Sequence, residues 1–361
     1  MVMKFGGSSV ADAEKIRKVA KRVIQTKGKN NKVVVVVSAP GDRTDELIEL
    51  AHQVTPVIDA REMDMLVSTG EQMSISLLSM AIKSLGYDAI SLTGAQVGIM
   101  TDTRHMDAKI TRIHTDKIEK NLKLGKIVIV AGFQGINDSN DITTLGRGGS
   151  DLTAVALAKV LNADICEIFT DVSGIYNADP RVVPEARQLE QISYDEMLEM
   201  ASSGAQVMQA RSILFAKKYD VDIHVRSTFT QKPGTLITRE VTYMEDVVVS
   251  GVTCDKNQAK ISIIDVPDKP GVAADVFGSL AKDNINVDMI IQSSATSGRN
   301  DISFTVSRNH LKKTMEVMEK VKKSLKAKQL ISDDKIAKVS IIGVGMRTHA
   351  GVAAEMFKTL A

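Results

Sequence analysis

Five consecutive valines, Val33 to Val37, do most to limit the folds open to this chain. A run of β-branched residues without polar alternation is typical of a strand covered on both faces, as in a parallel sheet. The runs Ile127–Val130 and Ile165–Phe169 repeat the pattern. Helical periodicity between these runs predicts helices over 12–26, 45–53, 71–84, 151–161, 193–203 and 206–218. The alternation predicts an α/β domain over residues 1–240, with a three-layer α/β/α arrangement.

An internal repeat follows this domain. Residues 259–264 read Ala-Lys-Ile-Ser-Ile-Ile and residues 337–342 read Ala-Lys-Val-Ser-Ile-Ile, and the stretch 270–281 is answered by 350–361. Each copy is a strand, a Gly-centred loop and an amphipathic helix, and the first continues into a βαββα unit of the α+β, ferredoxin-like type. The copies are placed at 247–330, which is complete, and 331–361, which is partial. A sheet that stopped there would have an edge without a partner, so we expect a truncated sequence or completion by another chain.

Composition and charge exclude several classes of function. The 361 residues carry 46 Lys and Arg against 44 Asp and Glu, for a net charge of +2, and 4% are aromatic. The chain lacks the basic field and stacking side chains of a nucleic-acid-binding protein, so we expect no nucleic-acid partner. No signal peptide precedes Met3 and no apolar run approaches the ~18 residues of a membrane span, so we expect a cytoplasmic protein without membrane contact. Cys166 and Cys254 lack metal-ligand spacing, and we expect both to be buried thiols.

The glycine-rich loop over residues 143–151, Thr-Thr-Leu-Gly-Arg-Gly-Gly-Ser-Asp, carries the most chemical information. Arg147 between glycines offers a planar, bidentate donor with a backbone that a ligand can approach closely. Ser150 or Asp151 is expected to cap the helix that follows, and a helix N-terminus after a glycine loop favours anions. A capped loop without a ligand is the alternative.

The N-terminal segment Lys4-Phe-Gly-Gly-Ser-Ser is a second candidate phosphate site. Its pattern places a lysine at a strand end before a glycine turn whose backbone amides can surround phosphate oxygens. Neither a Walker A motif nor a dinucleotide-binding glycine motif is present. Taken alone, the segment is also compatible with a simple strand-end turn.

Five motifs in this order resemble those of a known family: the N-terminal segment, Gly70-Glu71, Gly132-Phe-Gln-Gly135, the 144–151 loop and the 170–181 loop. With the tandem repeat, the chain resembles the monofunctional, lysine-pathway aspartate kinases (aspartokinases), with a second ACT domain that is C-terminally incomplete. The resemblance covers essentially the whole chain and implies an amino acid kinase fold followed by ACT domains. It implies transfer of the γ-phosphoryl group of ATP, with Mg²⁺, to the β-carboxylate of L-aspartate, giving 4-phospho-L-aspartate. This reaction is the first step towards lysine, threonine and methionine.

The resemblance also implies roles for single residues. Lys4 would face the transferred phosphoryl group, and Asp151 would hold Lys4 and the metal region in place; Asp151 as a plain capping residue is the alternative. Arg147 would bind a substrate carboxylate and Glu71 the substrate ammonium, unless Glu71 only favours the helix N-terminus. The substrate-binding residues are expected to be Ser38, Thr44, Glu71, Arg147, Gly148, Gly149 and Ser150.

The implied nucleotide site combines the N-terminal segment with the 170–181 loop. Its expected residues are Lys4, Phe5, Gly6, Gly7, Ser8, Thr170, Asp171, Tyr176, Asp179, Arg181 and Gln206. We expect no metal held by protein side chains alone. Relatives often carry Lys at position 206 and His-Pro at positions 209 and 210, where this chain has Gln209-Ala210. Gln206 supplies no charge, so this departure puts the strength of ATP binding in doubt.

The ACT repeat implies feedback regulation by lysine, threonine or both. The expected effector-binding residues are Asp268, Gly271, Val272, Ala273, Asn286, Val287, Asp288 and Gln292. The expected partners are a second copy bound through ACT domains or an ACT-only subunit. Two alternative functions stay open: a kinase of the same fold that acts on glutamate, N-acetylglutamate or a nucleoside monophosphate, and a catalytically weak amino-acid sensor.

Overall fold

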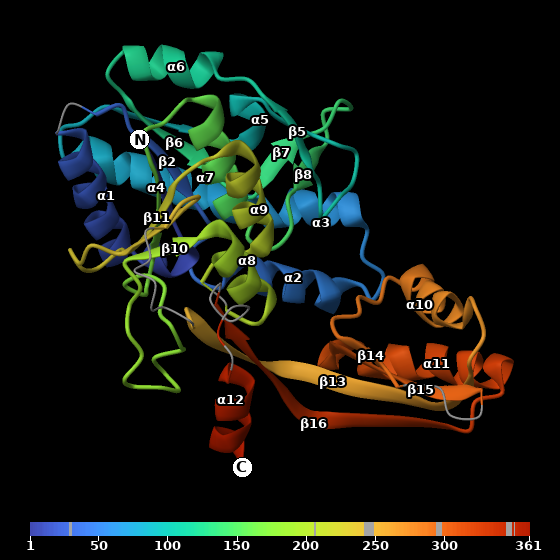
Figure 1. Cartoon of the computed structure of the whole chain (residues 1–361). Helices are drawn as coiled ribbons and strands as arrows, with labels where there is room; N and C mark the ends of the chain where they lie inside the picture. The colour runs from blue at the N-terminus through green and yellow to red at the C-terminus, as the bar shows by residue number, and fades with distance from the viewer. Residues whose placement is uncertain (29–30, 206, 242–248, 294–297, 344–348, 350) are drawn as a thin grey trace. The chain divides into compact units, whose positions relative to one another are not determined.

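The computed structural model describes residues 1–361 except 29–30, 206, 242–248, 294–297, 344–348 and 350. The chain divides into two units, Met1–Val252 with Ile341–Ala361, and Thr253–Ser340 (Figure 1). Within the described part, no helix is both long enough and apolar enough to cross a membrane.

An eight-stranded sheet forms the centre of the first unit. In spatial order its strands are β10 (Gln191–Ser193), β12 (Thr235–Thr238), β11 (Ile223–Ser227), β9 (Cys166–Thr170), β1 (Val2–Phe5), β2 (Val34–Val37), β6 (Ile127–Ala131) and β3 (Ala89–Leu92). The strands from β11 to β3 run parallel, and β12 is antiparallel to β11. The four residues of β2 are all buried, as expected for a strand covered on both faces.

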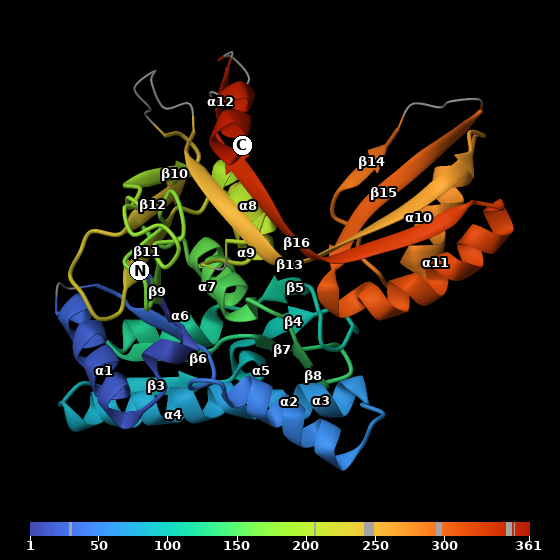
Figure 2. The same cartoon turned by 90° about the horizontal axis from the view of Figure 1, so that it is seen from below.

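Helices cover both faces of this sheet. On one face lie α1 (Ala13–Lys27) and α4 (Thr69–Ser84). The other face packs against α5 (Gly94–Val97), α6 (Asp116–Lys123), α7 (Gly149–Val160), α8 (Tyr194–Ser202) and α9 (Ala210–Tyr219). Figure 2 shows α1 and α4 on the side of the strands opposite to α7, α8 and α9. The expected three-layer α/β/α arrangement is confirmed.

Several elements of the first unit were not predicted. They are a second sheet of β5 (Ile110–Ile113), β4 (Ile99–Thr101), β7 (Gln134–Ile136) and β8 (Ile142–Thr144), and the helices α3 (Ala60–Val67), α5 and α6. These strands have three or four residues each, and α6 has only Ile118 and Asn121 buried. Such short elements carry too little periodicity to be recognised from a single sequence. The remaining elements of this unit are α2 (Arg43–Val54), the 3₁₀ turn Gly7–Ser9 and α12 (Val352–Leu360).

The second unit has the expected ferredoxin-like order of elements. A sheet in the order β14 (Ile290–Gln292), β15 (Arg299–Ser307), β13 (Gly251–Pro267), β16 (Gln329–Ile342) packs against α10 (Val272–Lys282) and α11 (Leu311–Leu325), with a 3₁₀ turn at Arg308–His310.

The prediction that both cysteines are buried is wrong for Cys254, which is exposed, whereas Cys166 is buried. On β13 alternate residues face opposite sides, and Thr253 takes the buried side.

Helix α4 offers a paired test of how the core stabilises the first unit. Leu78 is fully buried and the adjacent Leu77 is 41% exposed. We expect Leu78→Ala to lower the free energy of unfolding by about 2–5 kcal/mol, because it leaves a cavity under the sheet. Leu77→Ala is the control and should change it by less than about 0.5 kcal/mol. Chemical denaturation measures both, and equal losses would contradict this packing.

Candidate active site

The expected catalytic and substrate-binding residues line one cavity of about 410 Å³. They come from segments far apart in the chain: Lys4 on β1, Ser38 and Thr44 after β2, Glu71 at the start of α4, and residues 147–151 between β8 and α7. The carboxyl ends of parallel strands meet at one sheet edge, where α/β proteins bind ligands.

A short ion pair lies at the centre of this cavity. Lys4 Nζ is 2.6 Å from Asp151 Oδ1, and the two side chains are only 12% and 9% exposed. Asp151 occupies the first turn of α7, where the helix dipole favours a carboxylate. The pair therefore fixes a lysine ammonium group at the strand end and keeps it at the cavity surface.

The loop before α7 depends on glycine at residue 148. The residue that caps α7 is Gly148, with φ of +69°, so the prediction that Ser150 or Asp151 is the cap is wrong by two or three positions. A Cβ atom at residue 148 would lie 1.9 Å from Cγ of Gln209. Arg147, next to this glycine, is exposed and takes part in no hydrogen bond or ion pair with the described residues. Its guanidinium group is free to bind an anionic ligand.

Glu71 is the buried carboxylate of the cavity. It is 3% exposed, and its Oε1 accepts a hydrogen bond from the backbone N–H of Ala39 at 3.0 Å. Its Oε2 is buried without a hydrogen-bond partner among the described residues. Burial raises the pKa of the Glu71 carboxyl to about 8, because loss of water disfavours the charged form. A ligand that brings a positive charge would restore the ionised form and give Oε2 a partner.

The N-terminal glycine turn has two free backbone amides. Gly6 N–H donates to the carbonyl of Phe169 at 3.2 Å, so this amide is already used. The N–H groups of Gly7 and Ser8 have no partner among the described residues and remain available for an anion. The side chain of Phe5 is fully buried and stacks on Phe169 with ring centroids 4.7 Å apart. Phe5 can therefore reach a ligand only through its backbone.

The other expected nucleotide residues lie outside this cavity. Thr170 ends β9 and donates a hydrogen bond to Asp171 Oδ1, and Tyr176 forms an isolated bridge with Gln188. The Arg181 side chain is 80% exposed and pairs with Asp179. Gln206 lies outside the described residues. None of the described residues of this group, Thr170, Asp171, Tyr176, Asp179 and Arg181, lines the cavity around Lys4.

The expected effector residues fall into two groups within the second unit. Asp268, Gly271, Val272 and Ala273 lie around the start of α10, where Asn300 Nδ2 donates to Asp268 Oδ1 at 3.2 Å. Asp288 N–H instead donates to the carbonyl of Thr305, and its carboxylate pairs with Lys338. Asn286 and Val287 adjoin Asp288, whereas Gln292 pairs with Ile302. Asn300 and Thr305 lie five positions apart on β15, or roughly 16 Å, so this unit alone does not cluster all the residues.

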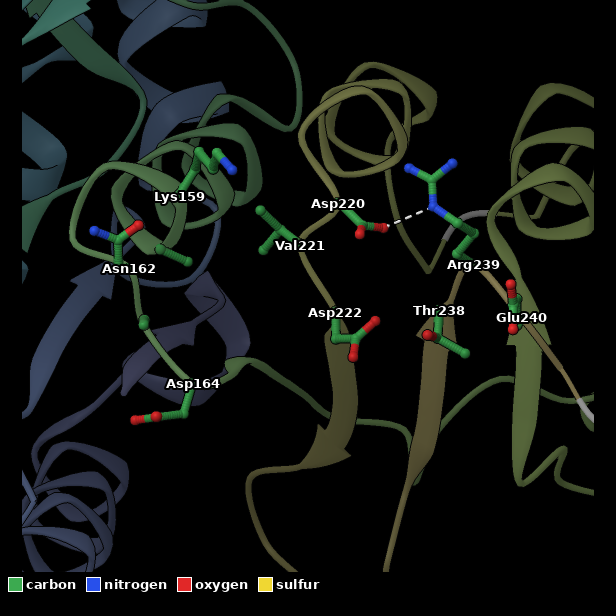
Figure 3. Close-up of a pocket in the computed structure, with 11 residues that line it drawn as sticks. Lys159, Asn162, Asp164, Asp220, Val221, Asp222, Thr238, Arg239 and Glu240 are labelled. Atoms are coloured by element: carbon green, nitrogen blue, oxygen red, sulfur yellow. Dashed lines mark hydrogen bonds and ion pairs between the residues drawn. The ribbon is translucent and has the colours of Figure 1, made fainter.

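A second cavity of about 550 Å³ lies at the end of the main sheet where β9 and β11 begin. Figure 3 shows the residues that line it. It is formed by the end of α7 and the turns at 162–164, 220–222 and 238–240. Its charged side chains are exposed, and Arg239 pairs with Asp220 at 2.8 Å. None of the expected site residues lines it. Among the described residues, no group of three or more His, Cys, Asp or Glu could hold a metal ion.

Comparisons with known proteins agree with both units. The chain matches the amino acid kinase family over residues 1–227 and an ACT domain over residues 261–321. It is 50% identical over 366 residues to the aspartokinase of Mycolicibacterium smegmatis, which covers 100% of this chain and 87% of the relative. The chain belongs to the aspartokinase family.

Solved aspartokinases share its architecture. E. coli aspartokinase III in complex with aspartate and ADP matches with a TM-score of 0.83 at 26% identity, over 99% of this chain and 91% of that chain. The same protein in complex with lysine and aspartate matches with a TM-score of 0.77 at 27% identity, over 99% and 90%. This member of the family is therefore an enzyme, a kinase with an ACT regulatory domain.

Several residues of this aspartokinase's cavity were missed by the sequence analysis. They are Gly41, Asp45, Ile48, Met63, Val67, Met106 and Phe133. Phe133 lies within the motif Gly132-Phe-Gln-Gly135. The amphipathic pattern of α3 is a signal that could have identified Met63 and Val67. Nothing in the sequence marks Met106, which reaches the cavity from an irregular loop with φ of +64°.

The raised pKa of Glu71 gives a pH-dependent term in stability. The folded-state pKa, about 8, lies above the ordinary value of 4.5. The proton therefore binds the folded state more tightly, and this stabilisation is fully present below about pH 4.5 and is lost as the pH rises to about 8. Glu71→Gln does not titrate. The unfolding free energy of this variant minus that of the wild type should therefore increase between about pH 4.5 and about pH 8 and stay constant above this range.

Denaturation at a series of pH values between about 5 and 9 measures this difference. Glu49→Gln on α2, an exposed position, is the control and should show no such trend. A Glu71→Gln difference that is independent of pH would contradict the raised pKa.

Proposed function

We propose that this aspartokinase transfers the γ-phosphoryl group of ATP to the β-carboxylate of L-aspartate in the cavity built around Lys4 and Asp151. The observation that carries the proposal is a pair of polar groups in the cavity that have no partner among the described residues. Arg147 is a guanidinium group without a partner among the described residues, and Glu71 Oε2 is a buried oxygen without one. Aspartate has a carboxylate and an ammonium on one carbon, which match these two groups. E. coli aspartokinase III, with a related structure, has been solved with aspartate and ADP.

The proposed roles are those that the family resemblance implies for residues that line this cavity. The α-carboxylate of aspartate accepts hydrogen bonds from Arg147, and its ammonium group donates to Glu71. This orientation directs the β-carboxylate towards Lys4, whose ammonium group neutralises charge on the transferred phosphoryl group. The free N–H groups of Gly7 and Ser8 add donors at the same place. Asp151 holds Lys4 in position through an ion pair, with 2.6 Å between Asp151 Oδ1 and Lys4 Nζ.

Magnesium fits this site as a companion of the nucleotide. Mg²⁺ commonly keeps several waters and is held by one or two carboxylates together with phosphate oxygens. Asp151 is the carboxylate of the expected catalytic set that would face it, and the described residues offer no larger cluster of ligands. When bound with ATP, the ion neutralises phosphate charge.

The nucleotide-side roles of Thr170, Asp171, Tyr176, Asp179, Arg181 and Gln206 stay part of the proposal. Arg181 pairs with its neighbour Asp179 in the free protein. Binding of a phosphate by Arg181 would therefore require this surface pair to open, which costs little because water and salt screen exposed ion pairs.

We also propose that the second unit binds a regulatory amino acid, lysine or threonine, together with another ACT-containing chain. Asp268 and Asp288 lie near opposite ends of β15 in one unit. A site that used both groups would need residues from a second unit. The E. coli protein with a related structure has been solved with lysine.

A single assay tests the reaction. The enzyme is incubated with ATP, Mg²⁺ and hydroxylamine, together with L-aspartate, L-glutamate or no acceptor. We expect acyl phosphate, trapped as the hydroxamate, with aspartate alone. Equal product with glutamate would indicate a different acceptor, and ligand binding by the second unit without any turnover would indicate an amino-acid sensor.

Lys4→Ala tests the phosphoryl site. Loss of a positioned charge in the transition state should lower kcat by about 10²-fold or more. Circular dichroism checks that the variant folds, since Asp151 loses its partner. Lys18→Ala, an exposed residue on α1 that pairs with Glu14 at 2.7 Å, is the control and should keep wild-type kcat. A folded Lys4→Ala enzyme with near-normal kcat would remove Lys4 from the catalytic site.

Arg147→Ala tests the substrate site. Loss of a charge-assisted hydrogen bond is worth about 1.5–3 kcal/mol, so KM for aspartate should rise by about 10–150-fold. KM for ATP should change little, because Arg147 is assigned to the amino acid. Arg104→Ala, which removes an exposed pair with Asp102, is the control. An equal rise in both KM values would mean that Arg147 does not recognise the amino acid specifically.

A further inference from the structure

Two irregular loops form one wall of the substrate cavity. The loop 105–108 supplies Met106, and the loop 145–148 supplies Gly146, Arg147 and Gly148. Met106 has φ of +64°, a left-handed conformation that is unfavourable for a residue other than glycine, whereas Gly146 adopts φ of +76° without strain. The two loops touch each other: Ala108 N–H donates to the carbonyl of Thr144 at 2.9 Å. The position of Arg147 therefore depends on how this pair of loops is held.

Asp64 on α3 holds the loops from one side. It is fully buried, and its carboxylate accepts hydrogen bonds from Met106 N–H at 3.0 Å and from the hydroxyl of Thr144 at 2.5 Å. His105 Nδ1 lies 2.7 Å from the other carboxylate oxygen. A buried carboxylate persists only where donors surround it. Here the donors come from the loop 105–108 and from Thr144, the last residue of β8 before the loop 145–148. Neighbouring residues of the same helix, Met63 and Val67, line the cavity.

Arg211 on α9 holds the same loops from the other side. Its guanidinium group donates to the carbonyl of Leu145 at 2.6 Å and to the carbonyl of Ala108 at 2.5 Å. It also donates to Asp107 Oδ1 at 3.1 Å. One planar group thus joins a carbonyl from each loop, which the fixed fork of a guanidinium suits better than a lysine ammonium does.

We propose that Asp64 and Arg211 are positioning residues of the amino-acid pocket, which clamp the loops carrying Met106 and Arg147 in the arrangement that binds the substrate. The inference rests on the proposed function, because it assigns these loops to the amino-acid side. Neither Asp64 nor Arg211 lines the cavity, so their effect passes through the loops that they hold. The hydrogen bonds of Asp64 and Arg211 go to residues 105–108, 144 and 145 and not to the glycine turn of Gly7 and Ser8, so we expect the nucleotide side to be affected less.

The physical consequence is a loss of preorganisation. A binding group that must be ordered by the ligand costs part of the binding free energy, even when every contact can still form. Weakening either residue should therefore raise KM for aspartate more than it lowers kcat, and it should leave KM for ATP near its wild-type value. A purely structural role would lower stability without this split.

The test uses two conservative substitutions with matched controls. Asp64→Asn keeps the shape but replaces one acceptor oxygen by an NH₂ group that faces a donor. Arg211→Lys keeps the charge but cannot bind both carbonyls in the same way. The controls are Arg61→Ala on α3, which removes exposed pairs with Glu62 and Asp141, and Lys217→Ala on α9, which removes an exposed pair with Asp195.

We expect each conservative variant to raise KM and the calorimetric Kd for aspartate by about 10-fold, with kcat and KM for ATP within about 3-fold. The double variant should raise them by less than the product of the single effects, because both residues hold the same loops. Both controls should match the wild type. Unchanged aspartate affinity in the folded variants, or equal changes for aspartate and ATP, would overturn the proposal.

Two further measurements cover the cases in which Asp64→Asn does not fold or the wild type is inactive. If Asp64→Asn does not fold, His105→Gln removes a single contact to Asp64 and should raise KM for aspartate by a smaller factor; no change in aspartate affinity there or in Arg211→Lys would overturn the proposal. The wild-type enzyme, assayed with aspartate in parallel, separates the two ideas. A wild type that does not phosphorylate aspartate contradicts the proposed function, whereas an active wild type with unaffected variants contradicts only the clamp.

Discussion

The ion pair between Lys4 and Asp151 is the contact on which the cavity depends. It joins the end of the central strand β1 to the first turn of α7, across 147 residues of sequence, at 2.6 Å. Both groups are largely removed from water, where the loss of one partner leaves an unpaired charge at high cost. The pair therefore sets the distance between the N-terminal glycine turn and the glycine loop of Arg147. Residues of both candidate anion-binding segments line one cavity, and this contact joins the two segments.

Other polar groups of the cavity have no partner among the described residues until a ligand enters. Glu71 is buried with one free oxygen, and its pKa is raised to about 8 by burial. Arg147 has no partner in the described structure, and the amides of Gly7 and Ser8 have none either. These unsatisfied groups are stabilised by a ligand with complementary charges, which is how a preformed site gains specificity. The proposed clamp of Asp64 and Arg211 adds the rigidity that such a site needs.

The sequence predicted those parts of the molecule that are determined locally. The valine run of β2 and the repeat around β13 and β16 established both fold classes, because burial on two faces and internal repetition appear in a single stretch of chain. Lys4, Glu71, Arg147 and Asp151 were predicted as a site from motifs, and their roles remain predictions. Asp64 and Arg211 were missed because their partners lie 41 to 104 positions away. The exposed Cys254 was wrongly predicted because an apolar run does not say which face of an antiparallel strand is covered.

Proton release on aspartate binding is a direct test of the pairing between Glu71 and the substrate ammonium group. With a pKa of about 8, Glu71 is roughly 90% protonated at pH 7 in the free enzyme. If the aspartate ammonium group binds this carboxyl, the proton must leave. Calorimetric titrations of aspartate at pH 7 in buffers of different ionisation enthalpy count the protons. The account predicts release of nearly one proton per aspartate in the wild type and none in Glu71→Gln. Binding with no proton release in the wild type would contradict it.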